Sequence, residues 1–113
     1  MIIDIWINCP SETDADRIAE ALMDKRLVAC ANRYPRIRSR YFWKGEIASE
    51  DEVPLLLKTR TSLFEAVVAT ARASHPYETP SVLCIDVAAA NQDYIDWIYA
   101  ETRVPDEGGA EGS

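Results

Sequence analysis

The sequence predicts an α+β protein of the ferredoxin-like class, in which an antiparallel β-sheet carries helices on one face. Segments in which apolar and polar residues alternate, as in strands, are interspersed with segments whose apolar residues have helical spacing. The resulting order is β-α-β-β-α-β-α. The second and third strands are separated by a tight turn and form a long hairpin. Right-handed crossovers in the two βαβ-like halves then place the helices on one face of the sheet.

The first strand is predicted over residues 2–8, where isoleucines alternate with polar or aromatic residues. Ser11 and Asp14 have the spacing of a capping box, which begins the first helix. Lys25 is expected in the last turn of that helix, where a cation favours the helix dipole. The short apolar run over residues 27–31 suits a buried second strand.

A long hairpin follows, with alternation over residues 36–43 and a return strand over residues 47–59. Lys44–Gly45 is the predicted turn, because glycine readily adopts a positive φ. Pro54 cannot donate to a ladder, so it requires a bulge or an edge at that point. This hairpin is too extended for so small a domain to cover, and its apolar end is expected to contact a partner subunit.

In the second half, Ser62 and Glu65 form another capping box, and the helix that they begin must stop at the prolines of residues 74–80. The apolar run over residues 82–87 predicts a buried strand. Asn91 is expected to cap a third helix, whose buried face holds Tyr94, Ile95, Trp97 and Ile98. Residues 1–103 therefore form a single domain. Residues 104–113, rich in glycine and acidic residues, are expected to be disordered.

Composition narrows the class of protein. Of the 113 residues, 48% are hydrophobic and 27% charged, as in soluble globular proteins, and the net charge of −7 argues against general binding to nucleic acid or anionic membranes. No apolar run approaches the length of a membrane span, and no secretory signal is evident, which predicts a cytoplasmic protein. The three cysteines are expected to be reduced, with Cys9 and Cys84 in the core.

The chain's single histidine lies in residues 74–80, between the second helix and the last strand. Two prolines fix the backbone of this segment, so it is either a rigid connector or a support that presents His75, Tyr77 and Glu78 to a ligand or metal. Imidazole, thiolate and carboxylate groups suit copper or zinc. One chain lacks the four ligands of a closed site, so a site between subunits is the more plausible form.

Several motifs, taken together and in this order, resemble the CutA1 family of divalent-cation tolerance proteins. The resemblance extends from residue 1 to about residue 103, and its motifs are residues 29–32 (ACAN), 39–45 (SRYFWKG), Glu52 with residues 55–59 (LLLKT), 75–80 (HPYETP), and Tyr94 with Trp97. It implies a ferredoxin-like fold, a cytoplasmic homotrimer related in architecture to the PII signalling proteins, and a role in tolerance to copper and other divalent cations.

The resemblance also assigns expected roles to residues. Cys30, His75 and Glu78 are the expected metal ligands. The expected metal is Cu(II) or another divalent cation, which is not bound tightly. A ligand cleft is assigned to Tyr77, Trp43 and Lys58, and the trimer interface to Tyr41, Phe42, Trp43 and Trp97. The hairpin departs from the usual pattern in its arginines, Arg33, Arg36, Arg38 and Arg40, whose role the sequence leaves open.

Three other functions are alternatives to metal tolerance. A Cys30–His75 catalytic pair is disfavoured, because a thiol in an apolar strand is inert. An RNA-recognition sheet would use the hairpin's aromatics and arginines. The negative net charge instead favours pairing of those arginines with Glu46, Glu50 and Glu52, across the hairpin or between subunits. The remaining alternative is a PII-like signalling or scaffold trimer whose intersubunit clefts bind a small anion, a nucleotide or a protein partner.

Overall fold

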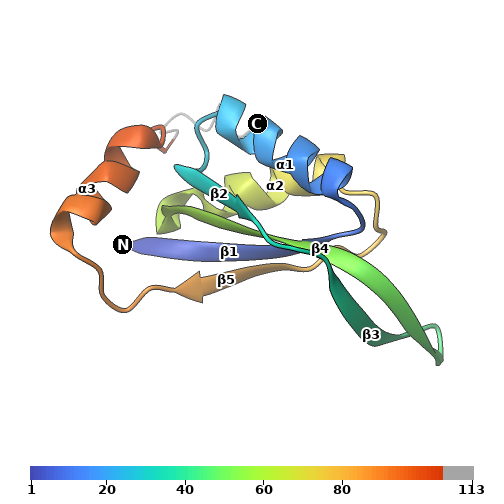
Figure 1. Ribbon diagram of the computed structural model, residues 1–113. Helices are drawn as coiled ribbons and strands as arrows, with labels where there is room; N and C mark the ends of the chain where they lie inside the picture. Colours follow the sequence, from blue (N-terminus) through green and yellow to red (C-terminus); the bar gives the residue numbers. More distant parts are fainter. Residues whose placement is uncertain (106–113) are drawn as a thin grey trace.

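The computed structural model describes residues 1–105 and confirms the predicted α+β fold (Figure 1). The prediction of a disordered tail falls mainly on residues 106–113, which lie outside the described part of the chain. Within residues 1–105, no helix is long and apolar enough to cross a membrane. The elements are β1 (Ile2–Cys9), α1 (Glu12–Asp24), β2 (Cys30–Arg33), β3 (Ile37–Trp43), β4 (Glu46–Arg60), a 3₁₀ turn (Thr61–Leu63), α2 (Phe64–Ser74), β5 (Val82–Asp86) and α3 (Gln92–Glu101).

The sheet has the strand order β2-β4-β1-β5, and all its pairs are antiparallel. The second half of β4 pairs with β1 and β2, whereas its first half pairs only with β3. Figure 1 shows this hairpin of β3 and β4 extending away from the body that α1 and α2 cover. The described chain thus consists of a helix-covered sheet and a projecting arm.

The core lies between the sheet and the helices α1 and α2. Ile3, Ile5 and Ile7 are fully buried on the helix side, opposite Leu55 and Leu57 of β4. Helical spacing brings the apolar side of α1 onto them, as the sequence predicts. The Ser11 hydroxyl accepts from the Asp14 backbone N–H, so this capping residue is confirmed. The residues of α1 and α2 buried in this core are Ala15, Ile18, Leu22, Val67 and Ala71.

On the opposite face of the sheet, α3 covers only the end at Ile2 and Arg60, and no other helix of residues 1–105 lies over the remainder. Trp6 of β1 lies between Leu56 of β4 and Leu83 of β5, and its ring contacts Tyr34 at a centroid distance of 5.1 Å. Leu83 is 53% exposed and Ile85 45% exposed. We call this surface the uncovered face.

Strand β5 therefore corrects one prediction. Its apolar run suggested burial, but β5 is an edge strand, paired only with β1, and most of it is exposed. Cys84 of β5 is exposed as well, contrary to the expectation of a core residue, whereas Cys9 is fully buried as expected. An apolar run indicates that a strand has apolar surface to bury, but it does not indicate whether the burying surface belongs to the same chain.

Pro54 lies opposite a bulge, as predicted: the pairing shifts from Arg33↔Leu55 to Ile37↔Glu52, so the three residues 34–36 face the two residues 53–54. It pairs with Asn8 within a continuous β4, and its carbonyl accepts from the Tyr34 N–H at 2.9 Å. In a strand, the N and O atoms of a residue point to the same neighbour, here the stretch 34–36 between β2 and β3. The chain leaves the ladder there, so the missing N–H of the proline costs no hydrogen bond.

The helix ends differ from prediction at two places. Helix α1 ends at Asp24, so Lys25 lies just beyond its last turn, and Arg26 adopts a positive φ of 55°. Strand β2 accordingly starts later than predicted, at Cys30, although the residues before it are buried. The prediction of a second capping box at Ser62 and Glu65 is wrong. A 3₁₀ turn precedes α2, and no side chain caps the N-terminus of either the turn or the helix.

The hairpin turn at Lys44–Gly45 is confirmed, and both residues have positive φ, 51° and 85°. This is the geometry of a two-residue turn that follows the twist of the paired strands. Asn91 lies at the N-cap of α3 as predicted, although its amide bonds to the Asp93 side chain and leaves the backbone N–H groups uncapped. Trp97, expected to be buried on α3, is 42% exposed.

Candidate ligand cleft and metal-ligating residues

His75 lies at the end of α2, only 8% exposed, and both ring nitrogens are bonded. Nε2 lies 2.9 Å from the Asn8 carbonyl oxygen, and Nδ1 lies 3.1 Å from the Tyr77 backbone nitrogen. A carbonyl only accepts and a backbone N–H only donates, so the proton is on Nε2 and the lone pair on Nδ1. In this conformation His75 attaches the 74–80 segment to β1.

The start of the segment is also attached to α1. Arg17 donates to the Ser74 carbonyl at 2.9 Å and pairs with Asp14 at 2.6 Å. Burial alone would raise the pKa of Asp14, but the hydrogen bonds that Asp14 accepts from Arg17 and Ser11 outweigh this effect and lower the pKa. The rings of His75 and Tyr77 lie 4.8 Å apart. These contacts fix the direction in which Tyr77 points.

Tyr77 points towards β4, where its hydroxyl donates to Oε2 of Glu52 at 2.9 Å. Glu52 is 6% exposed. Burial, together with the hydrogen bond and charge of Glu52, raises the pKa of Tyr77 far above its usual value. Tyr77 therefore remains a hydrogen-bond donor at any physiological pH.

A cleft of about 630 Å³ lies between this segment and the inner face of the hairpin. Aromatic side chains from both walls and three carboxylates line it, with one arginine, Arg40. Three carboxylates against one guanidinium give a formal charge of −2. The lining residues used below are Tyr41, Trp43, Glu50, Glu52, Tyr77 and Glu78.

Tyr77 and Trp43, two of the three residues expected to form a ligand cleft, line this cleft within one chain, whereas Lys58 lies elsewhere. Lys58 lies six residues from Glu52 along β4, about 20 Å at the rise of a strand. It is on the uncovered face, where its Nζ pairs with Asp4 at 3.1 Å. Within one chain, Lys58 does not contribute to the cleft.

Cys30 is placed beside Lys58, not beside His75. It pairs with Lys58 across β2 and β4, and Lys58 in turn pairs with Asp4 of β1. His75 contacts Asn8, four residues further along β1, about 13 Å away along the strand direction. No group of three potential His, Cys, Asp or Glu ligands occurs anywhere in residues 1–105. A single chain therefore holds these ligands apart.

The expected interface residues lie on two elements. Phe42 at the hairpin end is 78% exposed, Trp43 is 43% exposed, and Tyr41 is half-buried against the cleft. Trp97 is an exposed residue of α3, the helix that Figure 1 shows beyond the other end of the sheet. The chain leaves these aromatics available for contact.

Within residues 1–105 of one chain, the arginines of the hairpin do not pair with Glu46, Glu50 and Glu52, and pairing between subunits stays a prediction. Arg36 and Arg38 pair with Asp51, and Arg33 pairs with Glu12 and Asp16 of α1. The register explains the correction, because Arg38 lies opposite Asp51, whereas Glu50 and Glu52 lie opposite Ser39 and Ile37. Alternate residues face opposite sides of a strand, so arginines and glutamates occupy different faces.

Sequence reasoning placed Glu50 and Glu52 with the arginines and therefore missed them as cleft residues. The available signal was their period-two position opposite Ser39 and Ile37, on the hairpin face that carries Tyr41 and Trp43. The cleft itself depends on Tyr77, which is 25 residues from Glu52 in sequence.

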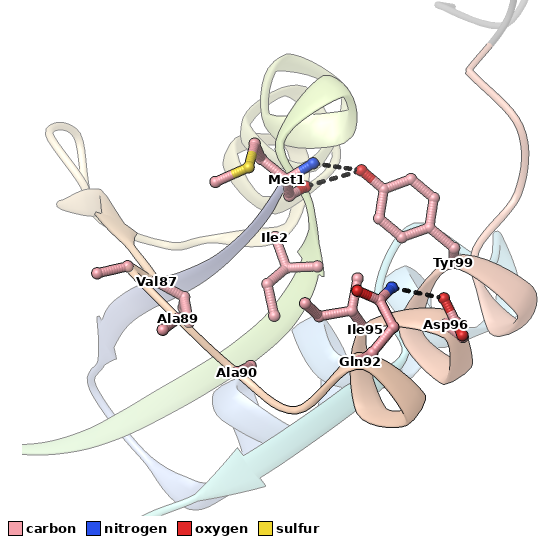
Figure 2. A pocket seen from close by; sticks show the side chains of 10 residues that line it. Met1, Ile2, Val87, Ala89, Ala90, Gln92, Ile95, Asp96 and Tyr99 are labelled. Carbon is pink, nitrogen blue, oxygen red and sulfur yellow. Dashed lines mark hydrogen bonds between the residues drawn. The ribbon is translucent and has the colours of Figure 1, made fainter.

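A second hollow, of about 470 Å³, lies between β1, the 87–90 loop and α3 (Figure 2). Figure 2 shows Tyr99 bonded to Met1 and Gln92 bonded to Asp96 across its rim. Ile2 and Ile95 point into it from the two walls. Its polar groups already bond to one another, so we assign it no function.

The fold and the projecting hairpin define a class of ferredoxin-like proteins that includes solved CutA structures. The CutA protein of Thermus thermophilus superposes with a TM-score of 0.88 at 38% identity, covering 91% of this chain and all of the other. The CutA protein of Archaeoglobus fulgidus gives 0.87 at 35% identity, covering 89% and 98%.

Sequence comparison identifies the family. The CutA1 divalent ion tolerance protein family matches residues 3–101, and this chain belongs to it. The divalent-cation tolerance protein CutA of Thermus thermophilus is 39% identical over 98 residues, 87% of this chain and 95% of the relative. A CutA homologue of Danio rerio is 40% identical over 94 residues, 83% of this chain. The chain spans 63% of that relative's length and 55% of the mouse CutA protein.

Proposed function

We propose that this chain acts in divalent-cation tolerance as a homotrimer that binds Cu(II) or another divalent cation between its subunits. The observation that carries the proposal is the position of Cys30 on the uncovered face. Packing another subunit against that face brings ligands of a neighbouring chain beside this thiol. A site shared by subunits also accounts for the separation of Cys30 from His75 within one chain.

The apolar surface supports the assembly. Leu83 and Ile85 on the uncovered face and Phe42 at the hairpin end are all large, apolar and substantially exposed. Large exposed apolar side chains at these two places on a small protein are typical of interaction sites. The open edge of β5 adds unpaired backbone groups that another strand can bond.

The ligand chemistry suits a soft or borderline cation. Cys30 supplies a thiolate, Glu78 an exposed carboxylate, and Nδ1 of His75 a lone pair. Coordination by Nδ1 replaces the hydrogen bond from the Tyr77 N–H, at a cost of about 1–3 kcal/mol for the donor left unpaired. This cost predicts moderate affinity. Thiolate and imidazole together favour copper or zinc over magnesium.

The test is anaerobic calorimetric titration of Cu(II) into the reduced full chain. Cys30→Ser and His75→Ala are each expected to weaken binding about tenfold or more, which is about 1.4 kcal/mol. Cys84→Ser removes an exposed thiol from β5 and serves as the matched control, with no expected change. Equal affinities in the wild type, Cys30→Ser and His75→Ala would refute the site.

The alternative function, an intersubunit cleft for a small anion or nucleotide, is not favoured by the cleft described here. Its three carboxylates repel an anion, and only Arg40 offers a compensating charge. The protein's negative net charge acts in the same direction.

A further inference from the structure

Glu52 is a buried carboxylate without a cationic partner. It is 6% exposed, lines the cleft, and accepts one hydrogen bond, from the neutral hydroxyl of Tyr77. Within residues 1–105 no Lys, Arg or His nitrogen lies within ion-pair distance of it; the ion pairs of the hairpin go to Asp51 instead. Glu52 is thus a mostly buried carboxylate whose one side-chain hydrogen bond comes from a neutral donor, so a cation that enters the cleft would supply the opposite charge.

Glu50 provides a second carboxylate at a defined separation. It lies two residues before Glu52 in β4, on the same face, which places the two backbone positions about 7 Å apart. The Tyr41 hydroxyl donates to Oε1 of Glu50 at 3.0 Å, just as Tyr77 donates to Glu52. Two tyrosines thus hold two carboxylates in a row along one wall.

The dimensions and walls of the cleft exclude a simple metal site. A volume of about 630 Å³ is many times that of an ion, and the described residues offer no group of three ligands. The aromatic rings of Tyr41, Trp43 and Tyr77 suit a hydrocarbon chain, and their faces attract ammonium groups. The opposite wall adds the exposed carboxylate of Glu78.

We propose that the cleft binds a linear aliphatic diamine, or the diamine portion of a longer polyamine. One ammonium group pairs with Glu52 in the buried part of the cleft, the other pairs with Glu50, and the methylene chain between them lies along the aromatic rings. An extended butane-1,4-diamine separates its ammonium groups by a length similar to the spacing of the backbone positions of Glu50 and Glu52. Arg40 remains at the cleft without a role in the pairing.

This ligand differs from the cation assigned to Cys30, and the inference stands whether or not a metal binds there. The test is calorimetric titration of the full chain with butane-1,4-diamine, with butan-1-amine as the singly charged comparison and magnesium chloride as the inorganic one. Glu50→Gln removes one of the two charges at an exposed position. Glu20→Gln makes the same change on the exposed face of α1 and serves as the control.

The expected result is diamine binding at least about tenfold tighter than monoamine binding, a difference that Glu50→Gln abolishes and Glu20→Gln leaves intact. Glu52→Gln is expected to abolish diamine binding and, because it removes a buried unpaired charge, to leave the unliganded protein as stable as the wild type or more stable. Equal affinity for diamine and monoamine would overturn the inference. So would displacement of the diamine by equimolar magnesium, or no diamine binding at millimolar concentrations.

Discussion

Replacing Tyr77 by phenylalanine tests whether the cleft wall is held by the hydrogen bond to Glu52. The change deletes a single hydroxyl, which donates at 2.9 Å to a carboxylate that is 6% exposed. The ring contact with His75, at 4.8 Å, is preserved. Any loss of stability is therefore due mainly to the hydrogen bond.

Hydrogen bonds to charged groups contribute about 1.5–3 kcal/mol. Tyr77 is only half-buried and Glu52 borders the cleft, so water reaches the site in the variant and the lower end applies, about 1.5 kcal/mol. The assay is equilibrium unfolding in guanidinium chloride at matched protein concentration, because the proposed assembly would make the apparent stability depend on concentration.

Tyr94→Phe is the control, since the Tyr94 hydroxyl forms no hydrogen bond within residues 1–105, although its ring stacks on Trp97. The control is expected to change the free energy of unfolding by less than about 0.5 kcal/mol. In the background of Glu52→Gln, the cost of Tyr77→Phe should fall, because the acceptor is then uncharged. An equal effect of the two tyrosine substitutions, or no coupling to Glu52, would refute the role given to Tyr77.

Three further outcomes are expected. Because the pKa of Tyr77 is raised on folding, its contribution to the free energy of unfolding is complete below the ordinary tyrosine pKa of 10.0 and is lost as pH rises above 10.0 towards the folded value. In denaturant titrations at alkaline pH, the free energy of unfolding should therefore fall more steeply with pH for the wild type than for Tyr77→Phe. Burial raises the pKa of the Cys9 thiol to about 12, so iodoacetamide at neutral pH should modify Cys9 only as the protein unfolds, and rapid labelling of the native state would contradict its burial. Leu83→Glu places a charge on the uncovered face and should dissociate the assembly without unfolding the subunit, as measured by sedimentation velocity and circular dichroism; an unchanged sedimentation coefficient would contradict the proposed interface.

Local patterns were enough to predict the parts of the fold that depend on neighbours in sequence. The alternation of Ile3, Ile5 and Ile7 predicted which face of β1 is buried, and Lys44–Gly45 predicted the hairpin turn. The second capping box failed because tertiary contact overrides propensity. The Thr61 N–H bonds to the Met1 carbonyl, and a 3₁₀ turn precedes the helix.

The site was less predictable, because its parts come from separate elements. Tyr77 and Glu78 drew attention as parts of a proline-bounded segment, but the buried partner of Tyr77 is a glutamate in a strand that also carries several exposed acids. Only the register of β3 on β4 separates Glu52 from Asp51. Similarly, the apolar run in β5 predicts burial, and only the three-dimensional arrangement shows that most of β5 is left exposed by residues 1–105.

The most direct test of a cation site assembled between subunits is Cu(II) titration of the dissociated Leu83→Glu variant beside the wild-type assembly. This variant retains Cys30, His75 and Glu78, so every proposed ligand is still present in each chain. We expect the assembly to bind Cu(II) and the isolated subunit to bind it at least about tenfold more weakly. Equal affinity and stoichiometry in the isolated subunit would show that the ligands act within one chain and would contradict the proposal.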